Sequence, residues 1–389
     1  MPATGKRARR RLLASTSVVL ALAAAGLGCA TPALATGPNV GPVKPADHRI
    51  APKFRNRASL AAVSCEGSSW CMAVGSYISQ FHGHALAQVW NGRRWQIVPK
   101  VPGRSLTSLS CLSVSFCVAG GGPTGAERWN GRSWLTMNMG RPTGGLAGIS
   151  CGSRTSCMDI YPLLDGPVVQ SWNGRQWHIW KQATNVCFGP PGVPCGLAGV
   201  SCGSTSNCVA VGTTQYKFDS DERTSSVVWN GKRWAFSQPP GGNPAAMNAV
   251  SCVGRFCMAV GGGYADIFQG TIAIAAIWNA ATKSWTDVSP KLGSICAEVA
   301  ACVWANVVSC GTPSNCMTLG PGGNQSWNGQ GWQPAPSVSA GGGSALVAVS
   351  CGRTFCVAVG YQTIHFVRHS LTELWNGNSW LLQKPVDPF

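Results

Sequence analysis

The sequence is poor in acidic side chains, in helical patterning and in recognisable catalytic motifs. Only 13 of the 389 residues are Asp or Glu, against 30 Lys or Arg. No Ser-His-Asp arrangement or phosphate-binding glycine loop stands out, and the cysteines lack the CxxC-like spacing of a zinc site. No convincing helical period occurs beyond the N-terminal segment, which leaves strands as the regular structure. We therefore predict an all-β chain that holds no metal and no other cofactor.

The N-terminal segment carries the features of an export signal. Basic residues precede an apolar run over 12–27, and Ala33-Leu34-Ala35 supplies a cleavage site. The run is short for a membrane span, so we predict a signal peptide over 1–35, a secreted, extracellular product and no transmembrane span in the mature form. Cys29 leaves a lipoprotein signal open, and the arginines at 9–11 leave twin-arginine export open beside the general secretory route.

Positive charge dominates the mature chain. Removal of the five basic residues of the signal lowers the formal net charge from +17 to +12. This excess favours anionic partners such as cell-wall polymers, acidic glycans or lipid headgroups, whereas export argues against nucleic acid. Residues 36–58 form a basic, proline-rich leader, which is either a flexible spacer or a wall-binding arm.

One unit repeats seven times along the chain. Each copy has an apolar run that ends in Ser-Cys and a second run that begins with Cys. Six copies continue with a phrase of the form Trp-Asn-Gly-x-x-Trp, and the fifth has the looser WNAATKSW (278–285). The Ser-Cys runs are LAAVSC (60–65), LTSLSC (106–111), LAGISC (146–151), LAGVSC (197–202), MNAVSC (247–252), ANVVSC (305–310) and LVAVSC (346–351).

The length and content of the unit indicate a propeller. A period of about 40–58 residues that holds four short apolar runs is typical of propeller blades. We predict a seven-bladed β-propeller over 59–389, with four antiparallel strands per blade, in which the last blade packs directly on the first. The blades are expected at about 60–103, 106–143, 146–194, 197–244, 247–303, 304–343 and 346–385.

Two motifs resemble kelch repeats. Val260-Gly261-Gly262 is similar to the double-glycine strand of that family, and IWNAATKSWTDVSP (277–290) is similar to its Tyr…Trp hairpin, with Trp278 in the Tyr position. The resemblance covers all seven units, although most carry the shorter WNGxxW and the family lacks the cysteine pairs. It implies a β-propeller. Kelch propellers are mostly binding scaffolds, but secreted copper-radical oxidases also use one, so function does not follow from the fold.

The cysteines beyond Cys29 fall into local pairs. In an exported protein such pairs predict disulfides, and their recurrence in every unit disfavours a redox role. The predicted pairs are Cys65–Cys71, Cys111–Cys117, Cys151–Cys157, Cys187–Cys195, Cys202–Cys208, Cys252–Cys257, Cys296–Cys302, Cys310–Cys316 and Cys351–Cys356.

The paired tryptophans admit two interpretations, a sugar-stacking platform or packing between blades. A turn over Asn91-Gly92 either pairs Trp90 with Arg93 or, as a four-residue loop, pairs Trp90 with Trp95. Both geometries place the two indoles on one sheet face. Because the phrase is uniform, we predict that it serves the fold that all units share.

Function is expected on the loops between the second and third strands, which vary in length and carry all five tyrosines. Rigid scaffolds present binding residues on such loops. We predict a monomeric recognition protein for a glycan, a cell-wall polymer or an extracellular protein. The proposed ligand-binding residues are Tyr77, Tyr161, Tyr216, Tyr264, Tyr361, His365 and Arg368. The turns at the opposite end are rich in Arg and Lys, which serve either solubility or docking on an anionic surface.

Catalysis is the alternative, in the form of a secreted glycoside hydrolase. That chemistry needs two carboxyl groups at a set separation. The candidate acids are Asp219, Asp221, Glu222 and Asp266. A solvated acidic loop explains the first three equally well, so a binding protein without enzymatic activity is the preferred prediction.

Overall fold

The structure is a computed structural model. It describes residues 57–121, 125–139, 146–161, 167–180, 195–216, 219–241, 245–266, 270–290, 305–320, 323–338 and 343–389. The chain divides after Pro52, and every described residue belongs to the second unit of that division, Lys53–Phe389. The predicted signal peptide and leader residues 36–56 lie outside the described residues. Within the described part of the chain, no helix has the length and hydrophobicity to cross a membrane.

The described residues form 28 β-strands, four from each repeat. The first and second repeats comprise β1 (Arg57–Cys65), β2 (Cys71–Ser79), β3 (His82–Trp90), β4 (Trp95–Ile97), β5 (Ser108–Ser113), β6 (Phe116–Gly120), β7 (Ala126–Trp129) and β8 (Trp134–Met137). The third and fourth comprise β9 (Gly148–Ser153), β10 (Ser156–Tyr161), β11 (Val168–Trp172), β12 (Trp177–Trp180), β13 (Cys195–Ser204), β14 (Asn207–Tyr216), β15 (Asp219–Trp229) and β16 (Trp234–Phe236).

The remaining repeats follow the same order. They comprise β17 (Ala245–Val253), β18 (Phe256–Asp266), β19 (Gly270–Asn279), β20 (Ser284–Asp287), β21 (Val307–Thr312), β22 (Asn315–Leu319), β23 (Gln325–Trp327), β24 (Trp332–Pro334), β25 (Ser344–Cys351), β26 (Cys356–Ile364), β27 (Val367–Trp375) and β28 (Trp380–Gln383). Strands within each repeat pair antiparallel with their chain neighbours, as at β5–β6, β6–β7 and β7–β8.

The all-β propeller prediction is confirmed, but the predicted seven blades are wrong. The structure has five four-stranded blades, formed by β5–β8, β9–β12, β13–β16, β17–β20 and β21–β24. The first and last repeats instead form one eight-stranded sheet, in which β27 and β1 are joined in parallel through Arg57 and Arg368. The two sheets merge because β1 begins at Arg57, ahead of the repeated motif, and reaches the extended β26–β27 pair.

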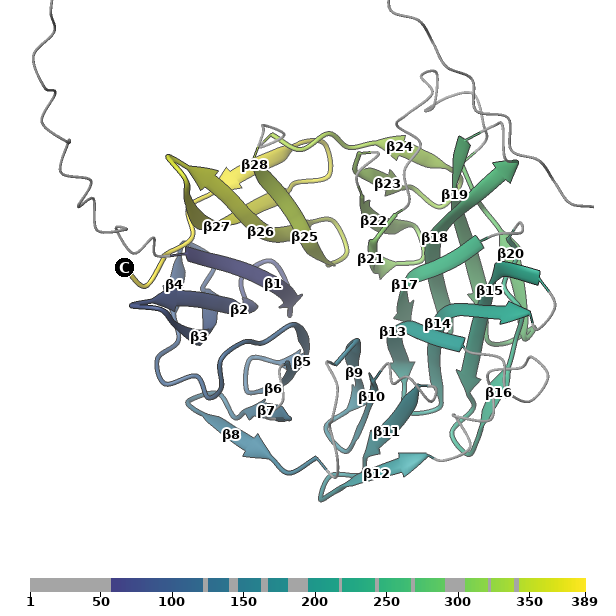
Figure 1. Cartoon of the computed structure of the whole chain (residues 1–389), viewed down its shortest axis with the longest axis horizontal. Helices are drawn as coiled ribbons and strands as arrows, with labels where there is room; N and C mark the ends of the chain where they lie inside the picture. Colours follow the sequence, from purple (N-terminus) through teal and green to yellow (C-terminus); the bar gives the residue numbers. More distant parts are fainter. Residues whose placement is uncertain are drawn as a thin grey trace, which may run out of the picture. The chain divides into compact units, whose positions relative to one another are not determined.

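The sheets surround a common axis with the first strand of each repeat innermost (Figure 1). These inner strands contact one another in chain order from β1 to β25, and β25 contacts β1 to close the ring. The Ser-Cys dipeptide of each repeat supplies the link. The amide of Cys111 donates to Ser64 Oγ of the preceding repeat at 3.0 Å, and the amide of Cys65 closes the series on Ser350 Oγ at 3.0 Å.

The same bond recurs at every step of the ring. The other donors and acceptors are Cys151 and Ser110, Cys202 and Ser150, Cys252 and Ser201, Cys310 and Ser251, and Cys351 and Ser309, at 2.9–3.0 Å. Each bond satisfies a backbone N–H that has no partner in its own sheet ladder. The constant Ser is therefore a part of ring closure that the sequence analysis did not assign.

A row of four residues crosses every sheet at one end. In the first repeat, Cys65 lies opposite Cys71, Cys71 opposite Trp90, and Trp90 opposite Trp95. The last pairing settles the turn geometry in favour of the four-residue loop. Asn91 Oδ1 accepts hydrogen bonds from the amides of Arg93 and Arg94 at 3.1 and 3.0 Å, and Gly92 has φ +86°. Asn recurs because its side chain bonds to the amides of the turn, and Gly recurs because the turn needs a positive φ.

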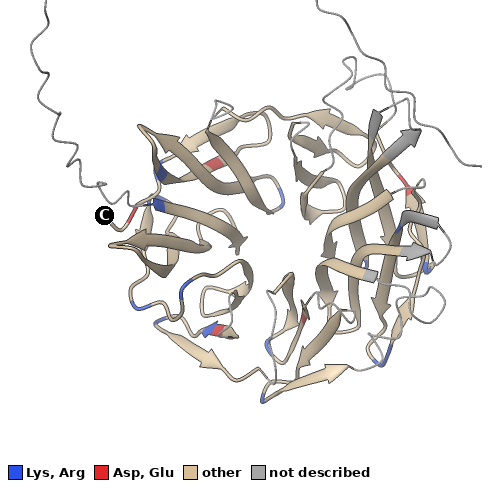
Figure 2. Ribbon diagram, in the orientation of Figure 1, with Lys and Arg blue, Asp and Glu red and all other residues tan. Residues whose placement is uncertain are grey.

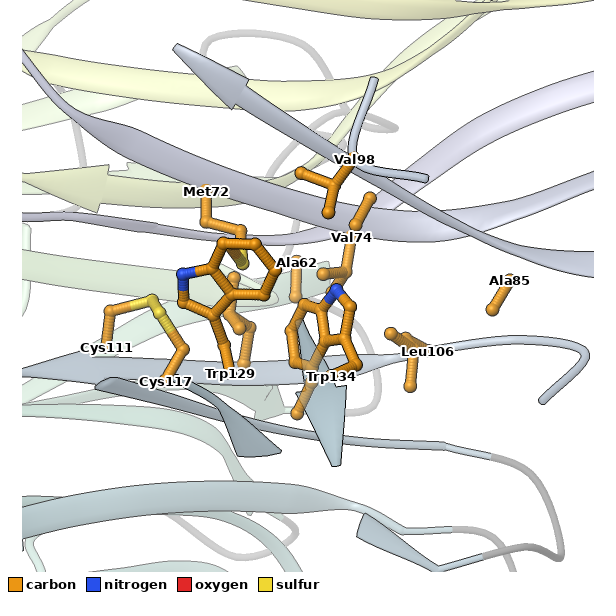
Figure 3. Packing of buried hydrophobic residues seen from close by; sticks show 13 residues of the cluster. Ala62, Met72, Val74, Ala85, Val98, Leu106, Cys111, Cys117, Trp129 and Trp134 are labelled. Atoms are coloured by element: carbon orange, nitrogen blue, oxygen red, sulfur yellow. A yellow bond between two sulfur atoms is a disulfide. The ribbon is translucent and has the colours of Figure 1, made fainter. Parts of the chain in front are cut away.

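The tryptophans pack between neighbouring repeats, as predicted. Trp129 and Trp134 of the second repeat share a buried cluster with Met72, Val74 and Val98 of the first (Figure 3). Ten of the fourteen paired tryptophans are at most 8% exposed, so their faces are not accessible to a sugar. A buried indole removes roughly 150–250 Å² from water, which makes these pairs the main apolar filler of the ring.

Seven disulfides join the cysteines at the start of these rows. They are Cys65–Cys71, Cys111–Cys117, Cys151–Cys157, Cys202–Cys208, Cys252–Cys257, Cys310–Cys316 and Cys351–Cys356. All seven match predicted pairs. The pairs Cys187–Cys195 and Cys296–Cys302 involve positions outside the described residues. Disulfides persist in oxidising compartments, so this set indicates an oxidising, extracellular environment.

Candidate binding face

Four repeats extend their second and third strands into long hairpins. These are β2–β3, β14–β15, β18–β19 and β26–β27, in the first, fourth, fifth and seventh repeats. The sequence analysis expected loops at these positions, but the chain continues the antiparallel ladder there, in the first repeat as far as the pairing of Ser79 with His82. We call the end of the ring from which these hairpins project the hairpin end. The opposite end, which carries the Asn-Gly turns and the disulfide turns, is the turn end.

A glycine marks the base of each long hairpin. A Cβ on Gly360 would lie 1.9 Å from the carbonyl oxygen of Ala345, because β25 bulges between Leu346 and Ala348. The bulge presses the backbone of the inner strand against the second strand, so only a residue without a side chain fits. Gly75, Gly212 and Gly261 meet the same backbone contact at 1.8–2.0 Å.

The hairpins of the first and seventh repeats end in turns of the same unusual kind. Gln80 and Phe81 have φ of 48° and 70°, and His365 and Phe366 have φ of 48° and 66°. Two-residue hairpin turns of this kind favour Asn-Gly, because other L-residues pay for a positive φ with about 1–2 kcal/mol. Phe81 and Phe366 are nevertheless each 74% exposed. A strained turn that displays an exposed aromatic ring points to function.

These two tips lie at the same edge of one sheet. The strand order is β26-β27-β1-β2-β3, and Arg57 at the start of β1 lies opposite both Arg368 and Ile78. Three strand spacings separate the midlines of the hairpins, which is about 14 Å. The merging of the first and last repeats therefore brings the two tips together as one surface, here called the paired-tip surface.

Each tip is backed by a tyrosine that contacts a basic side chain. Tyr77 stacks on His84 with ring centroids 4.9 Å apart. The guanidinium of Arg368 lies 3.9 Å from the ring centroid of Tyr361, a cation–π contact. Both tyrosines are half-buried, whereas His365 and Arg368 are exposed. Of the predicted ligand-binding residues, Tyr77, Tyr361, His365 and Arg368 thus lie on the paired-tip surface.

The C-terminal residues fasten the first repeat to the last. Asp387 accepts from the Ser370 amide at 3.1 Å and pairs with His369 Nδ1 at 2.8 Å. The amide of Val386 donates to Gln88 Oε1 on β3 at 3.2 Å. Ring closure therefore uses this tail beside the pairing of β1 with β27. The tail also fixes β27 beneath the second tip.

The other predicted ligand-binding tyrosines do not join this surface. Tyr161 is 3% exposed, and its hydroxyl donates to Met139 Sδ at 3.4 Å. It occupies the position of Gly75 in the first repeat and packs between blades, so it leaves the proposed set. Tyr216 ends β14 and Tyr264 lies two residues before the end of β18. The structure does not describe their side chains.

The candidate catalytic acids lie on two of the long hairpins. Asp219, Asp221 and Glu222 belong to β15, and Asp266 ends β18. Their side chains lie outside the described residues, so the paired-carboxyl hypothesis stays a prediction. A cavity of about 600 Å³ lies between the sixth and seventh repeats, next to Leu319, Pro336 and Leu346. No Asp or Glu is among its described lining residues, so it offers no carboxyl pair there.

Asp159 is a buried carboxyl group inside the third repeat. Asp159 on β10 is 0% exposed, lies opposite Gln170, and forms no hydrogen bond of normal geometry through its carboxylate oxygens. Burial raises its pKa well above the ordinary value, and the backbone of Gln170 offsets only part of that effect. Burial and the charge of Asp159 also raise the pKa of Tyr161. The matching position holds Ala73, Ala119, Ala210, Ala259 or Ala358 in five other repeats.

Comparison with known proteins places the chain in the class of β-propellers. No family model and no curated protein match it. Solved structures do. They include YCF48 bound to D1 peptide (TM-score 0.53, 14% identity, 86% of this chain and 94% of that one). U3-55K matches with a TM-score of 0.55 and 14% identity, over 83% of this chain and 98% of that one. The WD40 repeats of RRP9 match with a TM-score of 0.51 and 12% identity, over 79% of this chain and 90% of that one. At such identities the likeness concerns the fold alone, and the kelch resemblance stays a prediction.

Proposed function

We propose that the chain is a secreted recognition protein that binds an extracellular protein through the paired-tip surface. The observation that carries this proposal is the exposure of Phe81 and Phe366 on two strained turns of one sheet. A propeller of similar fold is described as bound to a peptide. Aromatic anchors that fill pockets on a partner dominate the energetics of protein interfaces.

The surroundings of the tips fit a protein better than a glycan. Ile78 and Ile364, on the strands that lead into the two turns, are 41% and 45% exposed. Arg57 and Arg368 provide a basic rim. Branched aliphatic side chains offer a sugar few polar contacts, whereas an apolar centre with a charged rim is the usual composition of a protein interface. The expected partner therefore presents apolar side chains bordered by acidic ones.

Site-specific photo-crosslinking tests where the partner binds. A benzophenone amino acid is placed at position 81 or 366, and the control is the same group at Leu135, which is 43% exposed on the outer strand β8. In intact cultures we expect one discrete crosslinked protein from both tips and none from Leu135. Crosslinks of equal yield from all three positions, or from none, would contradict the proposal.

Affinity measurements with the crosslinked partner then test the anchors. The double substitution Phe81→Ser and Phe366→Ser is expected to weaken binding about 1,000-fold, since each anchor contributes about 2 kcal/mol. Leu135→Ser should leave the affinity unchanged. A parallel glycan array distinguishes the ligand class, because glycan binding that depends on the two Phe side chains without protein binding would overturn the protein assignment.

A further inference from the structure

The turn end carries an array of cations that the proposed function does not use. The turns between first and second strands and between third and fourth strands hold Arg93, Arg94, Arg132, Arg154, Arg175, Lys232, Arg233, Arg255, Lys283 and Arg353, all exposed. Figure 2 marks Lys and Arg at intervals around the ring, with few acids among them. Glu66 is the single acid in the described turns of this end, and within the described residues no ion pair engages these cations.

The turns themselves do not require positive charge. In the sixth and seventh repeats, Gln330 and Asn378 occupy positions equivalent to Arg93, with the same bonds to the Asn side chain of the turn. The backbone is therefore satisfied whatever the side chain. The cations of the other repeats are an addition to a turn that folds without them, and they leave this end with a strong positive field.

Arg154 is an exception within the array. Its guanidinium donates to Ser113 Oγ and Ser115 Oγ of the preceding repeat at 3.0 and 3.2 Å, and it lies 5.8 Å from the ring centroid of Phe116. This side chain is held by a neighbouring blade, so part of its role is structural. We therefore leave it out of the proposed ligand contacts.

A groove opens among these cations between the fourth and fifth repeats. It has a volume of about 280 Å³. The fourth repeat lines it with Asn230, Arg233 and Phe236, and the fifth repeat lines it with Lys283. The fifth repeat differs from the others here because its turn between Trp278 and Trp285 is longer. This turn bends at Lys283, which has φ +54°, and Ala280 bonds to the Arg255 carbonyl at 3.1 Å.

We propose that the turn end binds an acidic polysaccharide and that the groove holds one of its carboxylate-bearing sugar units. Arg233 from one repeat and Lys283 from the next both line the groove and supply two cations for the acidic group. Asn230 can bond to hydroxyl groups, and Phe236 offers an apolar contact. The cations outside the groove attract the rest of the polymer. This proposal is independent of the proposed function, because it concerns the other end of the ring.

The composition of the turn end argues against two other anionic partners. Val114, at 53% exposure, is the only large hydrophobic side chain exposed in the described turns of this end, so a membrane would gain little from apolar insertion. An acidic peptide would pair with the cations, but its carboxylate side chains carry neither the flat ring face nor the hydroxyl groups that Phe236 and Asn230 would contact. A polymer of acidic sugars matches both features.

Binding of defined polymers to the oxidised mature chain tests the proposal. The probes are polygalacturonate, neutral dextran, poly-L-glutamate and phosphatidylglycerol vesicles, measured by calorimetry at 50 and 200 mM salt. We expect polygalacturonate to bind at least 10-fold more tightly than poly-L-glutamate, dextran not to bind, and the affinity to fall with salt as the charges are screened. Equal affinity for both polyanions, or binding to vesicles alone, would overturn the saccharide site.

Two double variants of equal charge separate the groove from the array. Arg233→Ser with Lys283→Ser should weaken polygalacturonate binding at least 10-fold. Arg132→Ser with Arg175→Ser removes the same charge away from the groove and should weaken it no more than 3-fold. Equal losses would show that no groove site exists. Unchanged thermal midpoints confirm folding of both variants, and unchanged crosslinking at Phe81 would show that the two ends act separately.

Discussion

The two ends of the ring are built from the same strands but differ in how strictly they repeat. At the turn end, each repeat has the same row of Cys, Cys, Trp and Trp, the same Ser-Cys bond to its neighbour, and nearly the same turn. At the hairpin end, four repeats extend long hairpins and three do not, and the tips differ. Features that hold the ring together must be present in every repeat, whereas features that meet a partner need occur only where the partner binds.

The disulfides provide the strongest test of the uniform end. Each closes a loop of a few residues and contributes about 2 kcal/mol by the chain-entropy model, so seven contribute on the order of 10 kcal/mol. That equals the whole stability of many domains. We expect full reduction to abolish the cooperative near-ultraviolet signal of the packed tryptophans at 25 °C. The variant Cys111→Ser with Cys117→Ser should lose only about 2 kcal/mol; an unchanged urea midpoint after full reduction would refute this account.

The second test concerns the glycine at the base of a long hairpin, where the hairpin leaves the repeated part of the sheet. In Gly360→Ala, the new methyl group would collide with the Ala345 carbonyl, a backbone atom that no side-chain rotation can move away. We expect a loss of about 3 kcal/mol in the free energy of unfolding. Gly83→Ala is the matched control, because its nearest neighbour is 3.9 Å away. Equal effects of the two substitutions in denaturant titrations would exclude the proposed clash.

The third test concerns Asp159, which stands inside a blade at a position where five other repeats have alanine. Because folding raises its pKa, the unfolded chain loses this proton first as pH rises above about 4, and the folded state keeps it. Stability should therefore fall with rising pH until the pKa of the folded state is reached. Asp159→Ala, which restores the residue of five other repeats, should raise the free energy of unfolding at pH 7 by about 1–3 kcal/mol and reduce this slope.

A second substitution at the same position separates charge from polarity. Asp159→Asn cannot ionise, so it should flatten the pH dependence as Asp159→Ala does. It keeps a buried polar group, however, so it should gain less stability than the alanine variant. Unfolding curves at pH 4, 5.5 and 7 provide the measurement, and parallel pH profiles for the wild type and both variants would contradict the assignment.

The hydrogen bond from the Cys amide to the Ser of the preceding repeat should contribute least to stability among the four features tested. Ser309→Ala removes the acceptor of the Cys351 amide, and an unsatisfied or re-solvated N–H costs about 1 kcal/mol. Ser379→Ala, at an exposed turn position, should change stability by less than half of that. Amide hydrogen exchange at Cys351 gives a direct readout, because protection there should fall in the first variant and stay constant in the second.

Repetition explains why the sequence analysis succeeded for the uniform end. The cysteine pairs and the Trp hairpins have local causes, namely short turns with Asn and Gly that place neighbours in the chain opposite each other. The constant Ser before Cys was equally visible. Its partner, however, is the amide of the Cys in the next repeat, 41–59 residues further along the chain. Its role could not be read from local pairing rules.

The variable end was less predictable because its features depend on pairing between distant strands. The stretches expected to be loops in the first and seventh repeats continue as strands, and only their pairing places Phe81 and Phe366 at the turns. Tyr161 was grouped with the other tyrosines by its order in the chain, although it lies at the Gly75 position and is buried. Strand register, which decides such positions, is set by contacts across the sheet.

By itself, the sequence determined the all-β propeller, the local disulfides and the packing role of the tryptophans, because each follows from short-range spacing that recurs in every repeat. Only the tertiary structure decided the division into five blades and one eight-stranded sheet, because that depends on whether β1 reaches β27 across the ring closure. The same contact brings Phe81 and Phe366, far apart in the chain, to one edge of a sheet. Ring closure is a long-range event, and the surface that it creates has no local signature.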